Sequence, residues 1–243
     1  MDIEDIGRLH DDAVRCARPS YTDPSTGYTV FTAETLRARG RCCGCGCRHC
    51  PYNHENVPLE QRASRISSPA LLAGSLDGLS ADGVDVLLWS GGKDSFLAAR
   101  ALVRERGPKA LLLLTTFDAR SRQVAHQEVS IDQVVRQARA VDVPLLGVPL
   151  WPHIPYSTRL EEALRFVAAS TVVKRVCTGD LHLADIRQWR EDNVAPVAAK
   201  LNAQMHYPLW NVPYDSLLRE LFGSAVPCTI SALDSAKVRA TRL

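Results

Sequence analysis

The sequence lacks long apolar runs, and none of its stretches approaches the roughly 18–20 residues that a membrane-spanning helix needs. Its start, MDIEDIGRLHDDAVRC, is acidic and has neither the apolar core of a signal peptide nor the arginine-rich amphipathic character of a transit peptide. These absences exclude membrane-embedded function classes, and we therefore expect a cytoplasmic protein without a membrane partner.

A strong excess of charge of one sign is also missing, because the formal net charge is only +2. Such a balance gives weak support to RNA as a partner. Lysine is scarce, with five of the 29 basic residues. That bias suits planar anion recognition by arginine, although a GC-rich genome would produce it too. No serine–histidine–acid or cysteine–histidine nucleophile arrangement stands out along the chain.

Cysteine, by contrast, is concentrated: five of the eight fall within nine residues, in RGRCCGCGCRHCPYNH. In a chain expected to be cytosolic, such a cluster indicates metal or redox chemistry rather than a disulfide scaffold. Cys47 and Cys50 have the spacing that lets two thiolates turn onto one metal. With Cys45 set aside, we expect Cys42, Cys43, Cys47 and Cys50 to be ligands. Zinc and a [4Fe–4S] cluster both suit thiolate ligands, and free or redox thiols are the third alternative.

The chain divides by pattern into three parts. Residues 1–58 form a Cys-rich region with few apolar residues, which favours a bound metal and allows docking to a protein partner. Residues 59–83 are polar and glycine-punctuated, and we expect a linker there, with a helical turn near Pro69–Ala73. Residues 84–243 alternate strand and helix patterns and form the main domain.

Within the main domain, apolar runs predict buried strands and 3.6-residue periodicity predicts helices. The expected strands are 84–89, 110–117, 144–150, 172–179 and 227–233, and the expected helices are 95–106, 130–141, 158–169, 183–192 and 216–223. Thr158 with Glu161 predicts a capping box, and Asp215 a cap. Strands separated by helices indicate an α/β fold with a doubly wound parallel sheet. Its ligand crevice is expected at the carboxyl ends of the strands.

The motif SGGKDS, residues 90–95, follows the first of these strands. Gly91 and Gly92 let the backbone approach a ligand, and the next helix offers free N–H groups and a positive dipole end. Ser90 and Ser95 add hydroxyl donors, and Lys93 adds a cation. Asp94 fits if a divalent cation bridges it to phosphate. The motif therefore predicts a nucleotide polyphosphate with Mg²⁺. It is not a Walker loop, because Leu87 and Asp94 stand where that motif needs glycine and serine or threonine.

Other candidates lie further along. Gly179 and Asp180 end a strand at the same edge, where Asp180 would hold Mg²⁺ or orient a ribose, or else cap the next helix. Arg187 and Arg190 flank Trp189 and would clamp phosphate or an acidic substrate, or else lie on a solvated helix face. His126 would bind substrate or move a proton, although a lone histidine is more often structural.

SGGKDS after the first strand resembles the pyrophosphate loop of the N-type ATP pyrophosphatases, an adenine nucleotide alpha-hydrolase-like family that cleaves ATP between the α and β phosphates. VAHQEVSIDQV, TGDLHLADIRQWRED and YPLWNVPYDSLLREL resemble segments of its diphthine–ammonia ligase branch. The resemblance spans residues 84–233. A glutamate-rich segment that usually follows in that branch is absent from this sequence, so the acceptor substrate stays open. GYTVFTAETLRARGRCCGCGCRHCPY resembles a short Cys-rich domain of uncharacterised function.

The resemblance implies an AMP-forming ligase that adenylates a substrate carboxylate and lets ammonia displace AMP to form an amide. Its cofactors would be ATP and Mg²⁺, with Lys93, Asp94, Asp180 and His126 in catalysis. Residues 90–95, Gly179 and Arg187 would hold the nucleotide. The alternative is a sulfur transferase of the same loop family, which adenylates a base carbonyl of RNA and uses a cluster or a persulfide at the cysteines. A nucleotide-binding module without turnover is the third possibility.

Overall fold

The computed structural model describes most of the chain, namely residues 4–24, 27–58, 61–62, 66–119, 121–124, 129–152 and 154–229. The chain forms two compact units, Met1–Asn211 and Val212–Leu243. In the second unit the structure describes helix α9 (Tyr214–Gly223), which buries Leu217 and Leu221. No helix among the described residues is both long and apolar enough to cross a membrane.

The amino-terminal part of the first unit is built from short elements. These are helix α1 (Glu4–Arg15), strands β1 (Ser20–Thr22) and β2 (Thr29–Phe31), and helix α2 (Ala33–Arg37). The two strands pair antiparallel, and Tyr21 of β1 packs with Ala13 of α1 in a small core of its own. Thr32 caps α2 by accepting a hydrogen bond from the backbone N–H of Thr35. A core of this size gives little stability by itself.

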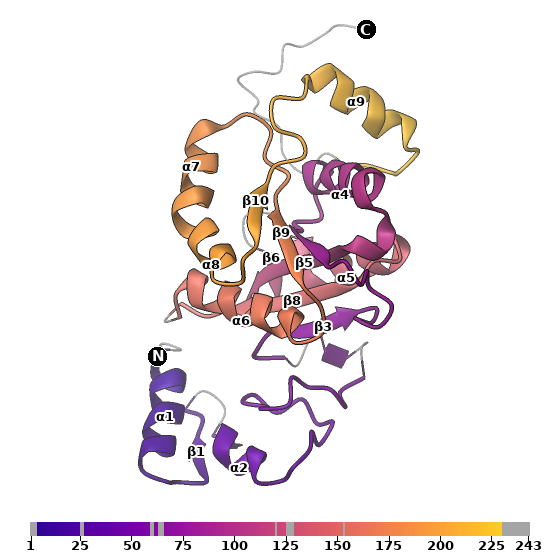
Figure 1. Ribbon diagram of the computed structural model, residues 1–243. Helices are drawn as coiled ribbons and strands as arrows, with labels where there is room; N and C mark the ends of the chain where they lie inside the picture. The colour runs from indigo at the N-terminus through magenta and orange to yellow at the C-terminus, as the bar shows by residue number, and fades with distance from the viewer. Residues whose placement is uncertain are drawn as a thin grey trace, which may run out of the picture. The chain divides into compact units, whose positions relative to one another are not determined.

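The rest of the first unit is an α/β sheet structure (Figure 1). Its described strands are β3 (Ala70–Ala73), β4 (Val84–Leu88), β5 (Leu111–Asp118), β6 (Gln123–Val124), β7 (Val129–Ser130), β8 (Leu145–Leu150), β9 (Val173–Cys177) and β10 (Gln204–His206). Its described helices are α4 (Lys93–Arg106), the 3₁₀ turn η1 (Pro108–Ala110), α5 (Ile131–Ala140), α6 (Tyr156–Ala168), α7 (Ala184–Asn193) and α8 (Ala195–Ala199).

Five of the strands form a parallel array in the spatial order β10-β9-β4-β5-β8. After β4, the chain adds β5 and β8 on one side of β4. It then adds β9 and β10 on the other side of β4. The strand order therefore reverses between β4 and β9, and ligands of such sheets bind at the carboxyl ends of the strands at this reversal. The expected α/β fold with a doubly wound, mostly parallel sheet is confirmed.

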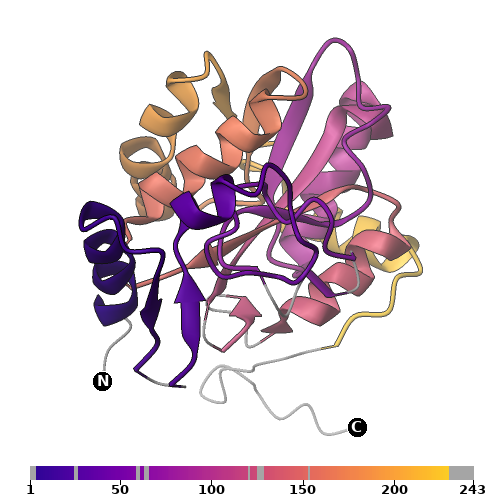
Figure 2. The same ribbon diagram turned by 90° about the horizontal axis from the view of Figure 1, so that it is seen from below.

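Helices cover both faces of this sheet, as the two ribbon views show (Figures 1 and 2). On one face, α6 and α8 share a core with inward side chains of the parallel strands, including Val86, Leu114 and Val176. Helices α4 and α5 pack against the other face. Because both faces are covered, a strand such as LLLLTTFD can be apolar without alternation, and this is what made β5 recognisable in the sequence.

The segment from 59 to 83 contributes a strand where we expected a helical turn. Residues 70–73 form β3, which pairs antiparallel with β8 at the edge of the sheet. Arginine side chains from other elements bind the carbonyls beside it: Arg122 donates to Ile66 and Arg159 donates to Ser67. Propensity alone is ambiguous for PALLA, and pairing with β8 decides its conformation.

Three smaller predictions about local structure were wrong. Helix α6 begins after Pro155 without a side-chain cap, so Thr158 and Glu161 form no capping box. Pro213 likewise precedes α9, and Asp215 lies in its first turn. In both helices a proline with extended ψ (140° and 129°) occupies the N-cap position, so Thr158 and Asp215 lie inside the first turn and not at the cap. Residues 227–229 are not in a strand, and the rest of that predicted strand lies outside the described residues.

Asp85 anchors the base of β4 and provides a stability prediction. Its carboxylate is 1% exposed and accepts hydrogen bonds from Arg106 (2.6 Å) and from two nitrogens of Arg175 (2.9 and 2.5 Å). Removing one partner of a buried ion pair leaves uncompensated charge. We therefore expect Asp85→Ala to lower the free energy of unfolding by about 3–5 kcal/mol.

Urea unfolding followed by circular dichroism would measure this change. Asp132→Ala is the matched control, because Asp132 is an exposed aspartate in the first turn of α5 and should cost less than about 1 kcal/mol. Equal losses in the two variants would contradict the buried role of Asp85.

Candidate active site

Two loops meet where the strand order reverses, and we call them the switch-point site: residues 90–95 after β4 and residues 178–180 after β9. In the first loop, Gly91 has φ +77°, a conformation that side chains rarely adopt. The chain turns there and enters α4 at Gly92, for which the described residues provide no side-chain cap. The first N–H groups of α4 therefore stay available to a ligand, at the positive end of a helix of 14 residues.

The hydroxyl groups of the loop hold its own backbone. Ser95, which is buried, donates to the carbonyl of Gly92 at 2.9 Å. The backbone N–H of Gly92 donates to the Ser90 hydroxyl at 3.3 Å, and that hydroxyl lies 3.3 Å from the Ser95 hydroxyl. These contacts fix the turn that presents the helix amino terminus. Both serines therefore shape the loop in this structure, in addition to their predicted role as ligand donors.

Lys93 and Asp94 form an ion pair at the mouth of the loop. The ammonium group lies 2.8 and 2.9 Å from the two carboxylate oxygens, and the side chains are 40% and 38% exposed. Surface pairs of this kind are weak, so a polyphosphate with a divalent cation can separate them at little cost. The pair thus holds one cation and one anion ready for a ligand that carries both charges.

Gly179 brings the second loop into contact with the first. A Cβ atom at this position would lie 2.8 Å from the carbonyl carbon and oxygen of Asp94 and 3.0 Å from the backbone nitrogen of Ser95. Only a residue without a side chain allows this approach. The two predicted loops therefore touch through backbone atoms, and Asp94 and Asp180 lie on adjacent loops at the same edge of the sheet.

Asp180 is not the helix cap that was the alternative for this residue. Helix α7 begins at Ala184 with Leu183 at its N-cap position and no side-chain cap in the described chain. Instead, Asp180 accepts a hydrogen bond from the Nε–H of Arg190 at 3.3 Å. Arg190, in the second turn of α7, thus orients a half-buried carboxylate at the switch-point site.

Arg187 lies between two aromatic rings rather than against solvent alone. Its guanidinium carbon is 4.6 Å from the ring centres of Tyr207 and of Trp210. The segment that carries both rings is held beside the second loop, because the backbone N–H of Asn211 donates to the carbonyl of Leu181 at 2.7 Å. Burial, and then the hydrogen bond to Glu191, raise the pKa of Tyr207, so its hydroxyl stays protonated.

Gln137 contacts the switch-point site, and the sequence analysis did not find it. Its side-chain amide donates to the carbonyl of Gly91 at 3.0 Å, from helix α5. Its own oxygen is buried and has no partner among the described residues. A glutamine on a helix face gives no local signal, so only the fold reveals that it holds the glycine turn from behind.

We expect Gln137→Ala to weaken nucleotide binding at the loop by about 2- to 10-fold, the effect of losing one ordinary hydrogen bond. Isothermal titration calorimetry with ATP and Mg²⁺ would measure the change in Kd. Gln133→Ala is the matched control, since Gln133 is an exposed glutamine on the same helix. A loss of affinity in both variants, or in neither, would contradict this role for Gln137.

Two further residues of the main domain were considered for chemistry, His126 and Cys177. His126, predicted to bind substrate or move a proton, lies outside the described residues. Cys177 is fully buried at the end of β9, and burial followed by the nearby charge of Asp85 raises the pKa of its thiol. A sealed, protonated thiol is a poor nucleophile. Cys177 is therefore not available as a sulfur carrier.

The Cys-rich region does not gather its four predicted ligands. The Sγ atoms of Cys43 and Cys47 lie 3.2 Å apart, and those of Cys42 and Cys50 lie 3.8 Å apart. Among the described residues, no group of three or more histidine, cysteine, aspartate or glutamate side chains is placed to hold a metal ion. The arrangement therefore does not fit a four-thiolate zinc ion or a [4Fe–4S] cluster.

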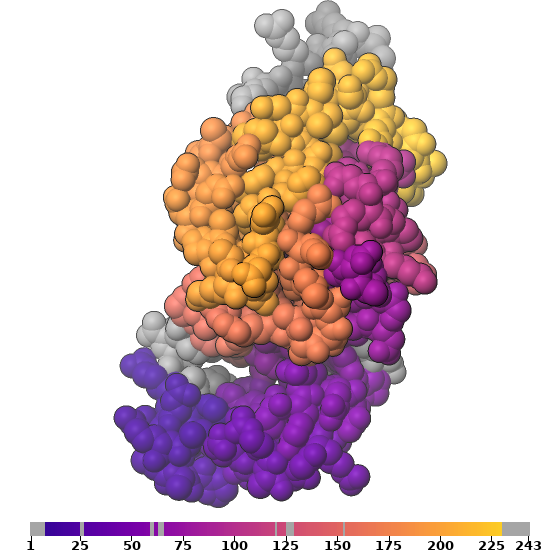
Figure 3. Space-filling view, in the orientation of Figure 1, coloured from indigo at the N-terminus to yellow at the C-terminus, as the bar shows by residue number. Residues whose placement is uncertain are grey.

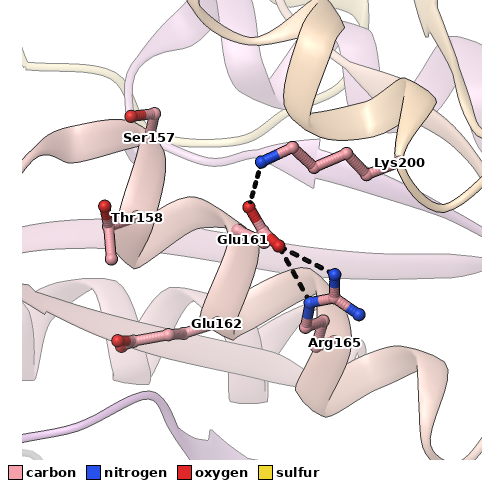
Figure 4. A pocket seen from close by; sticks show the side chains of 6 residues that line it. All are labelled: Ser157, Thr158, Glu161, Glu162, Arg165 and Lys200. Atoms are coloured by element: carbon pink, nitrogen blue, oxygen red, sulfur yellow. Dashed lines mark hydrogen bonds and ion pairs between the residues drawn. The ribbon is translucent and has the colours of Figure 1, made fainter.

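A hollow in the protein surface is formed by α6 and by Lys200, which follows α8. It is lined by Ser157, Thr158, Glu161, Glu162, Arg165 and Lys200 (Figure 4). Glu161 accepts hydrogen bonds from Lys200 at 2.5 Å and from Arg165 at 2.8 Å, and these bonds lower the pKa of Glu161. Glu162 pairs with Arg159, so the charged side chains that line the hollow are already paired with one another or with a neighbour.

The residues of the switch-point site fit Mg²⁺ bound together with a polyphosphate. Magnesium keeps several waters and needs one or two carboxylates when substrate phosphates supply further oxygens. Asp94 and Asp180 are such carboxylates, on two loops in backbone contact. Each carboxylate is paired with a cation, Asp94 with Lys93 and Asp180 with Arg190. Lys93 would turn to the phosphates when the metal binds, and Arg190 would keep Asp180 oriented.

Comparisons with known proteins give one family match in the Cys-rich region and similarities to two solved structures. Residues 9–56 match a family described as a family of unknown function, DUF5522. The chain also resembles the structure of a predicted subunit of a tRNA methyltransferase from Methanocaldococcus jannaschii, with 18% identity, 57% of this chain and 74% of that chain covered, and a TM-score of 0.37. The structure of the U34-tRNA thiolase NcsA from Methanococcus maripaludis, with its [4Fe–4S] cluster, is similar at 17% identity, with 90% and 75% covered and a TM-score of 0.38.

Proposed function

We propose that the switch-point site binds ATP with Mg²⁺ and that the protein is an adenylating enzyme, which cleaves ATP between the α and β phosphates. The observation that carries this proposal is the backbone contact of Gly179 with Asp94 and Ser95. It joins an uncapped helix amino terminus, a cation and two carboxylates at the reversal of strand order.

In the proposed reaction, an oxygen of the substrate attacks the α phosphate and pyrophosphate leaves. The N–H groups at the start of α4 and the ammonium of Lys93 would stabilise the charge on the phosphates. Mg²⁺, when bound, neutralises the leaving pyrophosphate. Asp94 and Asp180 would hold the metal, and Arg190 would keep Asp180 oriented. No nucleophilic side chain is needed, because positioning and charge stabilisation supply the rate.

For the acceptor, we favour an RNA base carbonyl that is converted by sulfur transfer, the alternative of the sequence analysis. Helix α7 has no buried residue, and Trp189 on it is 44% exposed with Arg190 at 5.3 Å from its ring. Exposed aromatic rings next to arginine are platforms on which unpaired bases stack. The exposed thiol of Cys43 supports sulfur chemistry in the same chain.

An amide-forming ligase is the second candidate, and one observation favours it. Among the described residues of the main domain, the only thiol near the switch-point site is Cys177, which is sealed in the core. Ammonia needs no carrier thiol, whereas sulfur would have to arrive from elsewhere.

The deciding experiment supplies [α-³²P]ATP and Mg²⁺ with either total RNA and a sulfide source, or a protein and metabolite extract with ammonia. Release of AMP and pyrophosphate supports adenylation, whereas ADP and phosphate would contradict it. RNA-dependent AMP release, with slower migration of the RNA in a mercury-containing gel, supports sulfur transfer. AMP release that depends on ammonia and is insensitive to ribonuclease would show the ligase instead.

A further inference from the structure

The Cys-rich loop reverses direction between Cys43 and Cys47. Gly44 and Gly46 have φ of +74° and +67°, and alternate with cysteine through the turn. A Cβ at Gly44 would lie 2.9 Å from the carbonyl oxygen of Asn56, so the close approach also needs glycine. The backbone conformation of the two glycines thus brings two thiols four residues apart into contact, at 3.2 Å between the Sγ atoms.

Side chains from the following segment hold this loop in place. The Asn56 amide donates to the carbonyl of Cys42 at 2.7 Å, and a ring nitrogen of the fully buried His54 lies 2.9 Å from the carbonyl of Cys47. Both ends of the turn are therefore anchored to one segment. The loop backbone and these two anchoring contacts hold the thiols of Cys43 and Cys47 at this short distance.

The other two cysteines lie deeper in the same cluster. Cys42 and Cys50 are 4% and 8% exposed and pack with Val57, and the partly buried Cys47 and Tyr52 pack against them. Cys43 is exposed and Cys47 is half-buried. The segment that carries them contributes to the molecular surface, in the indigo-to-purple part of the space-filling view (Figure 3). A reagent in solution can therefore reach the first pair and not the second.

We propose that Cys43 and Cys47 form a reversible thiol–disulfide site, in place of a four-cysteine metal centre. The thiolate of Cys43 attacks a low-molecular-weight disulfide, forms a mixed disulfide and releases one thiolate of the oxidant. The thiolate of Cys47 then attacks the Cys43 sulfur, forms the intramolecular disulfide and releases the second thiolate. The two protein thiols lose two electrons and two protons, and both pass to the oxidant as two thiols. This proposal goes beyond the proposed function and does not depend on it.

The test uses the full-length protein, reduced, freed of reductant and incubated with glutathione disulfide under anaerobic conditions. Remaining thiols are then alkylated with N-ethylmaleimide, and peptide mass spectrometry identifies the pairs. We expect one disulfide, between Cys43 and Cys47, that dithiothreitol reverses. Cys43→Ser and Cys47→Ser should each abolish it. Cys16→Ser and Cys45→Ser should retain it, since Cys16 is an exposed cysteine outside the loop.

Three outcomes would overturn the proposal. One is that, after incubation with glutathione disulfide, Cys43 and Cys47 are alkylated to the same extent as Cys16, which would mean that they formed no disulfide. Another is a disulfide that joins Cys43 or Cys47 to Cys45, or a Cys42–Cys50 disulfide that forms before the Cys43–Cys47 disulfide. The last is one metal ion per chain that protects all four cysteines from alkylation and is lost in both Cys43→Ser and Cys50→Ser. Because Cys43 is exposed, its variant should keep the melting temperature of the wild type, which shows that it folds. The assay contains no ATP, so failure of adenylation leaves its result unchanged.

Discussion

Replacing Lys93 with alanine should lower AMP formation by about 100- to 1,000-fold, the usual cost of removing one group that stabilises transition-state charge. The ammonium lies at the first position of α4, next to the N–H groups that would receive the phosphates. Asp94 pairs with this ammonium group, and both side chains of the pair are partly exposed. Alanine at this position keeps the helix and removes the cation. The measurement is release of labelled AMP from [α-³²P]ATP, with the Kd for ATP obtained by calorimetry.

Lys109→Ala is the control, because Lys109 is an exposed lysine away from the loop, in η1. It should leave AMP formation and affinity unchanged. Lys93→Ala should also weaken ATP binding by about 10- to 100-fold, since hydrogen bonds to charged groups contribute about 1.5–3 kcal/mol. Wild-type affinity and activity in Lys93→Ala would contradict nucleotide binding at the switch-point site. If the unmodified protein binds ATP but forms no AMP, it is a nucleotide-binding module without turnover.

The parts of this site that follow a strand directly were predictable from the sequence. An apolar run followed by SGGKDS identifies β4, the turn and α4, and the strand-order rule places Gly179 and Asp180 at the same edge. The contact between the two loops was not predictable, because it depends on the register of β4 and β9. Gln137 was missed for the same reason: its role depends on how α5 packs behind Gly91.

Local signals failed where a competing backbone constraint was stronger. Thr158 and Glu161 have the spacing of a capping box, yet Pro155, three residues before Thr158, occupies the N-cap position of the helix. The spacing of Cys47 and Cys50 indicates a pair, yet the positive φ of Gly44 and Gly46 brings Cys47 to Cys43 instead. In both cases a proline or a glycine decided a geometry that side-chain spacing had suggested otherwise.

Gly179→Ala should abolish measurable ATP binding, although it adds only one methyl group. The new Cβ would lie 2.8 Å from the backbone of Asp94 and 3.0 Å from that of Ser95, atoms that have no flexible end to move. The two loops must therefore separate, which displaces the start of α4 and the two carboxylates together. Overpacking of this kind typically costs about 1–3 kcal/mol of stability, so the fold should survive while the site does not. Calorimetry with ATP and Mg²⁺ and urea unfolding would measure the two effects.

Gly223→Ala is the matched control, because a Cβ there meets nothing within 4 Å and the change is chemically identical. It should keep wild-type ATP affinity and lose no stability. The comparison with Lys93→Ala separates geometry from charge. Gly179→Ala keeps Lys93, Asp94 and Asp180 and changes only their positions, so a loss of binding shows that the contact between the loops assembles the site. If Gly179→Ala bound ATP as well as Gly223→Ala, the nucleotide would have to bind without the second loop, and Asp180 would have no part in holding its metal.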